Sequence, residues 1–128
     1  MSSTTAPSVE PFKSYRDLQV WRRAIDLSVA LYQYTAEFPR EEIYGLSGQL
    51  RRAGVSVASN IAEGWGRSSS GEFRHFVGIA RGSNFEIQTQ LVIAKRLGFG
   101  TAEKLQTATD LSAEVGKMLV ALMKKLNS

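Results

Sequence analysis

Residues 49–67 read "QLRRAGVSVASNIAEGWGR", and this stretch decides the fold. Its apolar residues recur three or four positions apart, which is the period of one face of an α-helix. The apolar seam comprises Leu46, Leu50, Ala53, Val57 and, as a polar exception, Asn60. We predict a helix from Gly45 to Glu63, with Gly64 as a C-cap glycine. The asparagine in the seam and the arginines at both ends raise the question of what this helix does besides packing.

A helix is also predicted upstream, from about Tyr15 to Phe38. Ser14 and Asp17 resemble a capping box at its start, and Pro39 ends it because proline disfavours helix in the preceding residue. Its apolar residues form two rows: Leu18, Trp21, Ile25 and Tyr32 in one, and Val20, Ala24, Leu27, Leu31, Tyr34 and Phe38 in the other. Two rows make a face wider than one neighbouring helix covers, which favours assembly with further copies.

Two more helices follow downstream. One is predicted from Ser70 to Leu97, with a capping box formed by Ser69 and Glu72, and the glycines of "GFG" (98–100) end it. The other begins after Thr101 as N-cap and reaches about Leu126. Four long helices joined by short loops predict an all-α, up-down antiparallel four-helix bundle over residues 14–128.

The first residues, "MSSTTAPSVEP", are rich in Ser, Thr and Pro, and we expect residues 1–13 to be a disordered tail. They lack the charged start and apolar core of a secretory signal. Because no apolar run approaches the roughly 20 residues that span a bilayer, we expect no membrane association and a cytoplasmic location.

The residue inventory argues against most enzyme chemistry. The chain has no cysteine and one histidine, His75, so thiolate sites, multi-histidine metal sites and most catalytic triads lack their ligands or partners. The Glu-x-x-His pattern of di-iron bundles is missing. "GWGRSSSG" (64–71) has neither the lysine nor the preceding strand of a phosphate-binding loop. We therefore expect no cofactor, no metal and no enzymatic activity.

The net charge of +4 is concentrated in the middle of the chain. Residues 43–100 hold seven basic and three acidic residues, so their excess equals that of the whole chain. Arg74, Arg81, Gln88 and Lys95 lie seven apart, about two helical turns, and form one stripe. Such a stripe is equally compatible with ion pairs between helices or subunits and with contacts to phosphates.

Antiparallel pairing of the two central helices would place Asn60 near Arg74, and Arg52 near Arg81 or Asn84. Asparagines in a seam, here Asn60 and Asn84, more often fix helix register than bind a ligand. Four residues are thus assigned to the turn and to helix register: Asn60, Glu63, Gly64 and Asn84.

Two neighbours of the turn have alternative interpretations. Glu63 more simply pairs with Arg67 or Arg74 than acts in acid–base chemistry. Trp65, between two glycines, either stacks on a nucleic-acid base or fills a subunit contact.

Three segments together resemble a known family: "FKSYRDLQVWRRAIDLS", "FPREEIYGLSGQLRRAGVSVASNIAEGWGR" and "FRHFVGIARGSNFEIQTQL". They are similar to the small proteins encoded in intervening sequences of bacterial large-subunit (23S) ribosomal RNA genes. The resemblance extends from about Phe12 to Phe99. It implies a four-helix bundle that assembles into a ring-shaped homo-oligomer, usually a homopentamer. The accessory proteins of diversity-generating retroelements are similar, and they use a basic ring surface to bind nucleic acid and a reverse transcriptase.

Two functions are compatible with these features. In the first, the protein is a nucleic-acid-binding accessory protein whose phosphate contacts come from Arg51, Arg52, Arg67, Arg74 and Arg81. In the second, it is an assembly scaffold for a protein such as a reverse transcriptase, and the arginines pair with Glu63, Glu86 or acids of a neighbouring subunit. The two functions differ in whether the arginine charge is exposed or neutralised.

Overall fold

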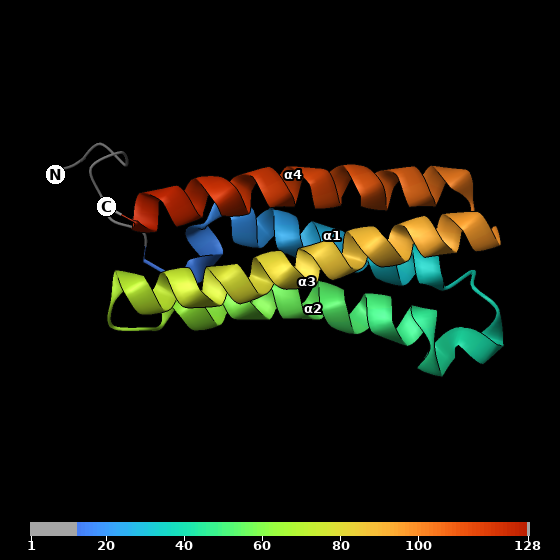
Figure 1. The fold of residues 1–128 in the computed structure, drawn as a ribbon, viewed down its shortest axis with the longest axis horizontal. Helices are drawn as coiled ribbons and strands as arrows, with labels where there is room; N and C mark the ends of the chain where they lie inside the picture. Colours follow the sequence, from blue (N-terminus) through green and yellow to red (C-terminus); the bar gives the residue numbers. More distant parts are fainter. Residues whose placement is uncertain (1–12, 128) are drawn as a thin grey trace, which may run out of the picture.

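The structure is a computed structural model, and it describes residues 13–127. Except for Lys13, the predicted tail (1–13) lies outside this range. Figure 1 shows four long helices, and all regular secondary structure within residues 13–127 is helical. The elements are η2 (Tyr15–Asp17), α1 (Gln19–Thr35), η3 (Arg40–Tyr44), α2 (Leu46–Trp65), α3 (Ser70–Leu97) and α4 (Ala102–Leu126), where η marks a 3-10 helix.

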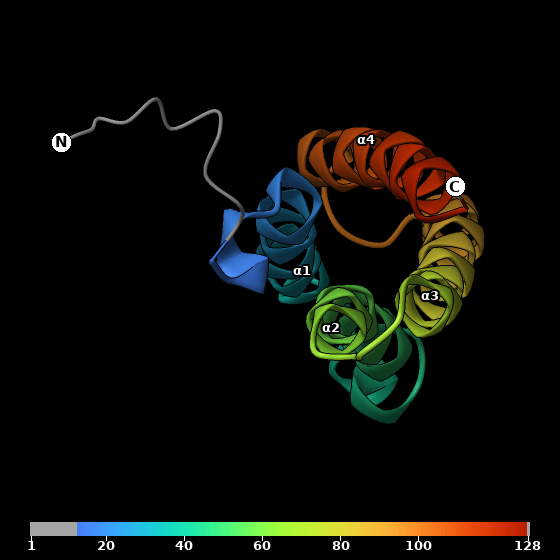
Figure 2. The same ribbon diagram turned by 90° about the vertical axis from the view of Figure 1, so that its left-hand side faces the viewer.

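The four helices form an up-down antiparallel bundle. Each long helix packs against two others, in the cyclic order α1, α2, α3, α4 and back to α1, and the end-on view in Figure 2 shows this arrangement. Two polar contacts connect the first part of the chain to α4: Arg23 of α1 donates to both carboxylate oxygens of Glu114, at 2.9 and 2.8 Å, and Glu37, just after the end of α1, pairs with Lys104 at 3.1 Å. Among the helices of residues 13–127, none is both long and apolar enough to cross a membrane.

The first predicted helix is wrong at both ends. Ser14 and Asp17 do form the expected capping box, but it caps the short η2. Leu18 then adopts an extended conformation, and α1 starts at Gln19. At the other end α1 stops at Thr35, and the chain turns with a bond from the Phe38 amide to the Thr35 carbonyl, because Pro39 disfavours helix in the residue before it.

Gly64 is not the C-cap glycine that the sequence predicted. The second helix continues through Trp65 and is capped by Gly66, whose φ of −76° is ordinary for any residue. Gly64 is buried inside the last turn, where a Cβ would lie 2.7 Å from the Phe73 ring and 2.9 Å from Phe76 Cβ. Its role is therefore close packing of α2 on α3 and not chain reversal.

The downstream helices match their predicted bounds. α3 spans Ser70–Leu97, and the Ser69 hydroxyl accepts a hydrogen bond from the Glu72 amide. Only this half of the predicted capping box forms, because the Glu72 carboxylate instead accepts from the Ser68 hydroxyl at 3.4 Å. Thr101 caps α4 through the Lys104 amide, as predicted.

The core lies on the inner faces of all four helices. The second apolar row of the first predicted helix is fully buried, with Leu27, Leu31 and Tyr34 at zero exposure. In the other row Leu18 is buried, whereas Ile25 and Tyr32 are exposed. The prediction that the apolar face is wider than one neighbouring helix covers is confirmed, because α1 packs on both α2 and α4 and still leaves Ile25 and Tyr32 exposed.

Candidate nucleic-acid interface

The five predicted arginines lie on the hairpin formed by α2 and α3, but their side chains point to different sides of the bundle. They neither converge on one site nor share one groove. Arg51 faces α1, Arg52 lines the groove between α2 and α3, and Arg74 and Arg81 face α4. We therefore describe the sides of the hairpin one at a time.

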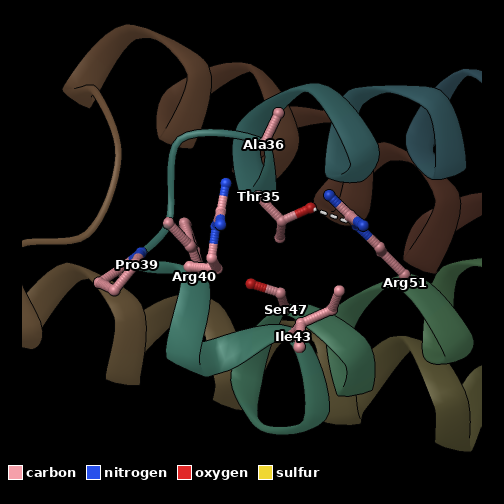
Figure 3. Close-up of a pocket in the computed structure, with 8 residues that line it drawn as sticks. Thr35, Ala36, Pro39, Arg40, Ile43, Ser47 and Arg51 are labelled. Atoms are coloured by element: carbon pink, nitrogen blue, oxygen red, sulfur yellow. Dashed lines mark hydrogen bonds between the residues drawn. The ribbon is translucent and has the colours of Figure 1, made fainter.

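Arg51 faces α1. Its Nε donates to the Thr35 hydroxyl at 2.8 Å, and its guanidinium lies 4.9 Å from the centre of the Tyr32 ring. Both contacts are local, and they hold the side chain against a pocket near the start of α2 (Figure 3).

Arg52 is exposed and lines a polar groove between α2 and α3. Across this groove lie Ser83 and Glu86, whereas Arg81 and Asn84 line a hollow against α4. The predicted proximity of Arg52 to Arg81 or Asn84 is therefore wrong. The reason is helical phase: Ser83 and Asn84 are successive residues about 100° apart around the axis, so only one of them can face α2.

Arg74 and Arg81 face α4. The Arg74 Nε donates to the Met123 carbonyl at 3.3 Å, so the predicted neighbour of Arg74, Asn60, is not its partner. The Arg81 guanidinium lies 5.0 Å from the centre of the Phe85 ring, where aromatic and cation attract each other. It lines a hollow of about 490 Å³ whose α4 side includes Lys117.

A second hollow of about 260 Å³ continues this face, and Gln88 lines both. Lys95 lines the second one, so three of the four residues of the predicted stripe, Arg81, Gln88 and Lys95, line two adjoining hollows. We call this surface the α3–α4 face, defined by Arg74, Arg81, Gln88, Lys95 and Lys117. Lys117 was not among the predicted residues, and its only signal in the sequence is its place on the α4 flank that carries Ala113 and Val120.

The α3–α4 face is positively charged because carboxylates are missing from it. No acidic residue lines either hollow. Within residues 13–127, neither Arg74, Arg81, Lys95 nor Lys117 lies within ion-pair distance of a carboxylate. Ion pairs among residues 13–127 therefore do not neutralise the positive charge of this face.

Arg67 differs from the other four arginines. It pairs with Glu63 at 2.8 Å, as the sequence predicted, and its guanidinium lies 4.6 Å from the centre of the Phe76 ring. The pair is exposed and spans one helical turn, so its contribution to stability is small. Trp65, predicted to lie in the loop, is the last residue of α2 and packs edge-on against Phe73.

The two seam asparagines form hydrogen bonds. Asn84 is 1% exposed; its Nδ2 donates to the Ser112 carbonyl at 3.0 Å, and its Oδ1 accepts from the Ser112 hydroxyl at 2.8 Å. Asn60 Nδ2 donates to Ser56, whose hydroxyl is bonded to that of Ser83 at 2.9 Å. Asn84 therefore links α3 to α4 directly, and Asn60 links α2 to α3 through Ser56.

Metal-ligating side chains do not gather in the described part of the chain: residues 13–127 contain no group of three or more His, Asp or Glu that could hold an ion. His75 packs against Phe76, with ring centres 5.6 Å apart. The feature of this surface that bears on function is therefore the positive charge of the α3–α4 face, which is unpaired within residues 13–127.

Comparisons with known proteins agree with this fold. Residues 16–121 match the family model described as 23S rRNA-intervening sequence protein. A solved structure, a protein of unknown function from the S23 ribosomal protein family of Bacteroides thetaiotaomicron VPI-5482, superposes with a TM-score of 0.74. It is 24% identical, and the match covers 82% of this chain and 95% of that one. At this identity the likeness shows a shared fold. Among curated proteins, none matches the chain.

Proposed function

The chain belongs to the family of 23S rRNA-intervening sequence proteins, and from this premise we propose that it is a non-enzymatic accessory protein that binds nucleic acid through its α3–α4 face. Binding would rest on contacts between cations and backbone phosphates. Such contacts position a protein on nucleic acid without reading its sequence. The proposed place of action is the cytoplasm.

One observation carries the proposal: three cations, Arg81, Lys95 and Lys117, line the two adjoining hollows of the α3–α4 face, and no carboxylate lines them. Arg74, Arg81 and Lys95 follow the helix at multiples of seven residues, so successive positions of the stripe are about 10 Å apart. A backbone that runs along the groove would meet them one after another. Arg81 stacked on Phe85 also provides a flat surface of the kind that nucleic-acid bases pack on.

Assembly would strengthen the binding. One subunit offers few cations, but a cyclic homo-oligomer repeats the face around its axis and the fields add. In the proposed homopentamer each subunit contributes one α3–α4 face, so affinity would depend on assembly as well as on the individual charges.

The salt dependence of binding tests the proposal. The logarithm of the affinity for duplex DNA should fall with the logarithm of salt concentration, with a slope of about −0.9 for each phosphate neutralised. Arg81→Glu should weaken binding at least tenfold, because it removes one cation and adds repulsion, and should lower the slope by about one. Fluorescence anisotropy with a labelled duplex and with single-stranded RNA measures both.

Arg52→Glu is the matched control, because it makes the same charge change on an exposed arginine that lines the α2–α3 groove instead. The proposal predicts that this control binds within a few-fold of the wild type. Affinity that is independent of salt, or equal losses in the two variants, would exclude phosphate contacts on the α3–α4 face.

A second function is favoured by the outer surface of α1. Ile25, Val29 and Tyr32 are exposed at spacings of four and three residues, and they form an apolar row on one side of the helix. In this alternative the row joins copies of the chain into a scaffold, and the partner of the assembled ring is a protein such as a reverse transcriptase. The exposed arginines would then pair across subunits.

A further inference from the structure

A pocket of about 210 Å³ lies where the chain turns from α1 into α2, at the opposite end of the bundle from the α2–α3 turn. Its walls come from three elements: the end of α1, the short η3 and the first turns of α2. Figure 3 shows that Arg40 and Arg51 stand on either side of it, with the hydroxyls of Thr35 and Ser47 between them. No residue that lines it is acidic.

The two arginines differ in how they are held. Arg51 Nε is bonded to the Thr35 hydroxyl at 2.8 Å, and this bond leaves its two terminal amino groups available for a ligand. Thr35 is itself fixed, because its hydroxyl donates to the Leu31 carbonyl at 2.7 Å. Arg40 is exposed and has no hydrogen-bond or ion-pair partner among residues 13–127. One guanidinium is thus positioned in advance, and the other is free to close on a ligand.

Ser47 adds a hydroxyl to the pocket. The residue is 4% exposed and lines the pocket, and its hydroxyl has no hydrogen-bond partner among residues 13–127. Gln90 Oε1 is the one fully buried side-chain N or O atom without a partner in this range, so the Ser47 hydroxyl is open to the pocket. A hydroxyl that points into a cavity flanked by two guanidiniums is suited to donate to an anionic oxygen.

Two nearby carboxylates are occupied elsewhere, and a third, that of Glu41, does not line the pocket. Glu42 accepts a hydrogen bond from the Leu46 amide at the start of α2, at 2.9 Å. Glu37 pairs with Lys104 and accepts from the Thr101 amide, and these contacts, the lysine first, lower its pKa below the usual value. The carboxylates of these two residues are therefore held at other partners, and the two guanidiniums are left for an external anion.

We propose that this pocket binds the phosphate group of a phosphate monoester. Such a group carries a charge of about −1.5 to −2 at neutral pH and three acceptor oxygens, which matches two guanidiniums and one hydroxyl donor. Arginine binds phosphate through paired N–H groups, so it is suited to this task. The volume admits the phosphate and a small substituent, which points to a terminal phosphate and not to a continuous backbone. The site does not rest on the nucleic-acid binding proposed for the α3–α4 face.

Titration with inorganic phosphate tests the pocket directly. Calorimetry should detect one saturable site for each chain at low ionic strength, and NMR should place the shifted amides around Ser47. Arg40→Gln and Arg51→Gln should each weaken binding roughly tenfold, the loss expected for one charge-assisted hydrogen bond. Arg40 is exposed and without a described partner, so its variant tests the site even if Arg51→Gln does not fold.

Arg52→Gln is the control, because it removes the same charge from the neighbouring residue of α2, which faces α3. It should bind phosphate like the wild type. The proposal is overturned if no saturable binding occurs, or if the three variants lose affinity equally, since either result would mean a diffuse response to charge.

Two oligonucleotides identify the source of the phosphate. If the ligand is a nucleic-acid end, a short RNA with a 5′-phosphate should bind more tightly than the same RNA with a 5′-hydroxyl, and Arg40→Gln should abolish the difference. If the two RNAs bind with equal affinity while the protein still binds inorganic phosphate, the ligand of the pocket is a small phosphate ester. Arg81→Glu should leave phosphate binding unchanged, so failure at either surface can be recognised separately.

Discussion

Gly98 and Gly100 form a matched pair at the residue scale. Both have a positive φ, 74° and 71°, which disfavours any residue with a Cβ. Their surroundings differ: nothing lies within 4 Å of a Cβ at Gly98, whereas one at Gly100 would lie 2.5 Å from the Tyr34 ring. That ring is fully buried and its hydroxyl donates to the Phe99 carbonyl at 2.8 Å, so it cannot easily move away.

The two alanine variants should therefore differ in stability. Gly98→Ala should lower the free energy of unfolding by about 1 kcal/mol, the cost of a left-handed conformation. Gly100→Ala should add a further loss of about 1–3 kcal/mol, because the methyl group overpacks the Tyr34 ring. Urea unfolding followed by circular dichroism measures both, and equal losses would show that the ring accommodates the methyl group.

Single residues show where sequence reasoning succeeds. Ser14, Ser69 and Thr101 were correctly assigned as caps, because a cap depends on residues within one helical turn. Gly64 was assigned wrongly because a glycine near a helix end is also what close packing against another helix requires. The atoms that decide between the two roles belong to Phe73 and Phe76, and their approach is a property of the folded hairpin.

At the scale of helices, the pair Asn84 and Ser112 fixes how α3 sits against α4. Ser112→Ala would leave the buried Asn84 Oδ1 without its donor, so we expect a loss of about 1–3 kcal/mol in the free energy of unfolding. The double variant Asn84→Leu/Ser112→Ala removes both polar groups and should recover part of this loss. Thermal and urea unfolding compare the variants.

Thr107→Ala is a suitable control for this pair, because Thr107 is exposed on the same helix and bonds only to its own helix, at the Glu103 carbonyl. Its effect should stay within about 0.5 kcal/mol. If the double variant is less stable than Ser112→Ala alone, Asn84 stabilises the bundle through more than the bond between its Oδ1 and the Ser112 hydroxyl.

The helices themselves were largely predictable, because apolar periodicity over many residues averages out local exceptions. The junction between α1 and α2 was not: "FPREEIYG" (38–45) has no period, and neither η3 nor its pocket was predicted. The candidate interface was predicted only in part, because periodicity locates residues along a helix but does not say which neighbouring helix they face. The stripe on α3 follows from seven-residue spacing, whereas Lys117 and the orientation of Arg51 and Arg52 depend on which helix each side faces.

At the scale of the whole molecule, the exposed apolar row on α1 predicts self-association. Val29 lies at the centre of this row and is 50% exposed. Val29→Glu should shift the protein from oligomer to monomer in sedimentation velocity, because a charge would be buried in the contact. The fold of the subunit should survive, since the side chain is outside the core.

Val92→Glu provides the comparison, because Val92 is 54% exposed and lines the α3–α4 face instead. It should assemble like the wild type and bind nucleic acid more weakly. A wild-type protein that sediments as a monomer at micromolar concentration would contradict the assembly proposal.

The even number of helices has a practical consequence for anyone who handles the protein. Because α1 starts and α4 ends at the same pole of the bundle, the start of α1 and the end of α4 both lie there, together with the α2–α3 turn (Figure 1). The end of α4 therefore lies a full helix length, about 30 Å for the 20 residues of α2, from the junction between α1 and α2. A label or surface attachment at Asn127 therefore leaves the pole that carries Arg40 open to solution.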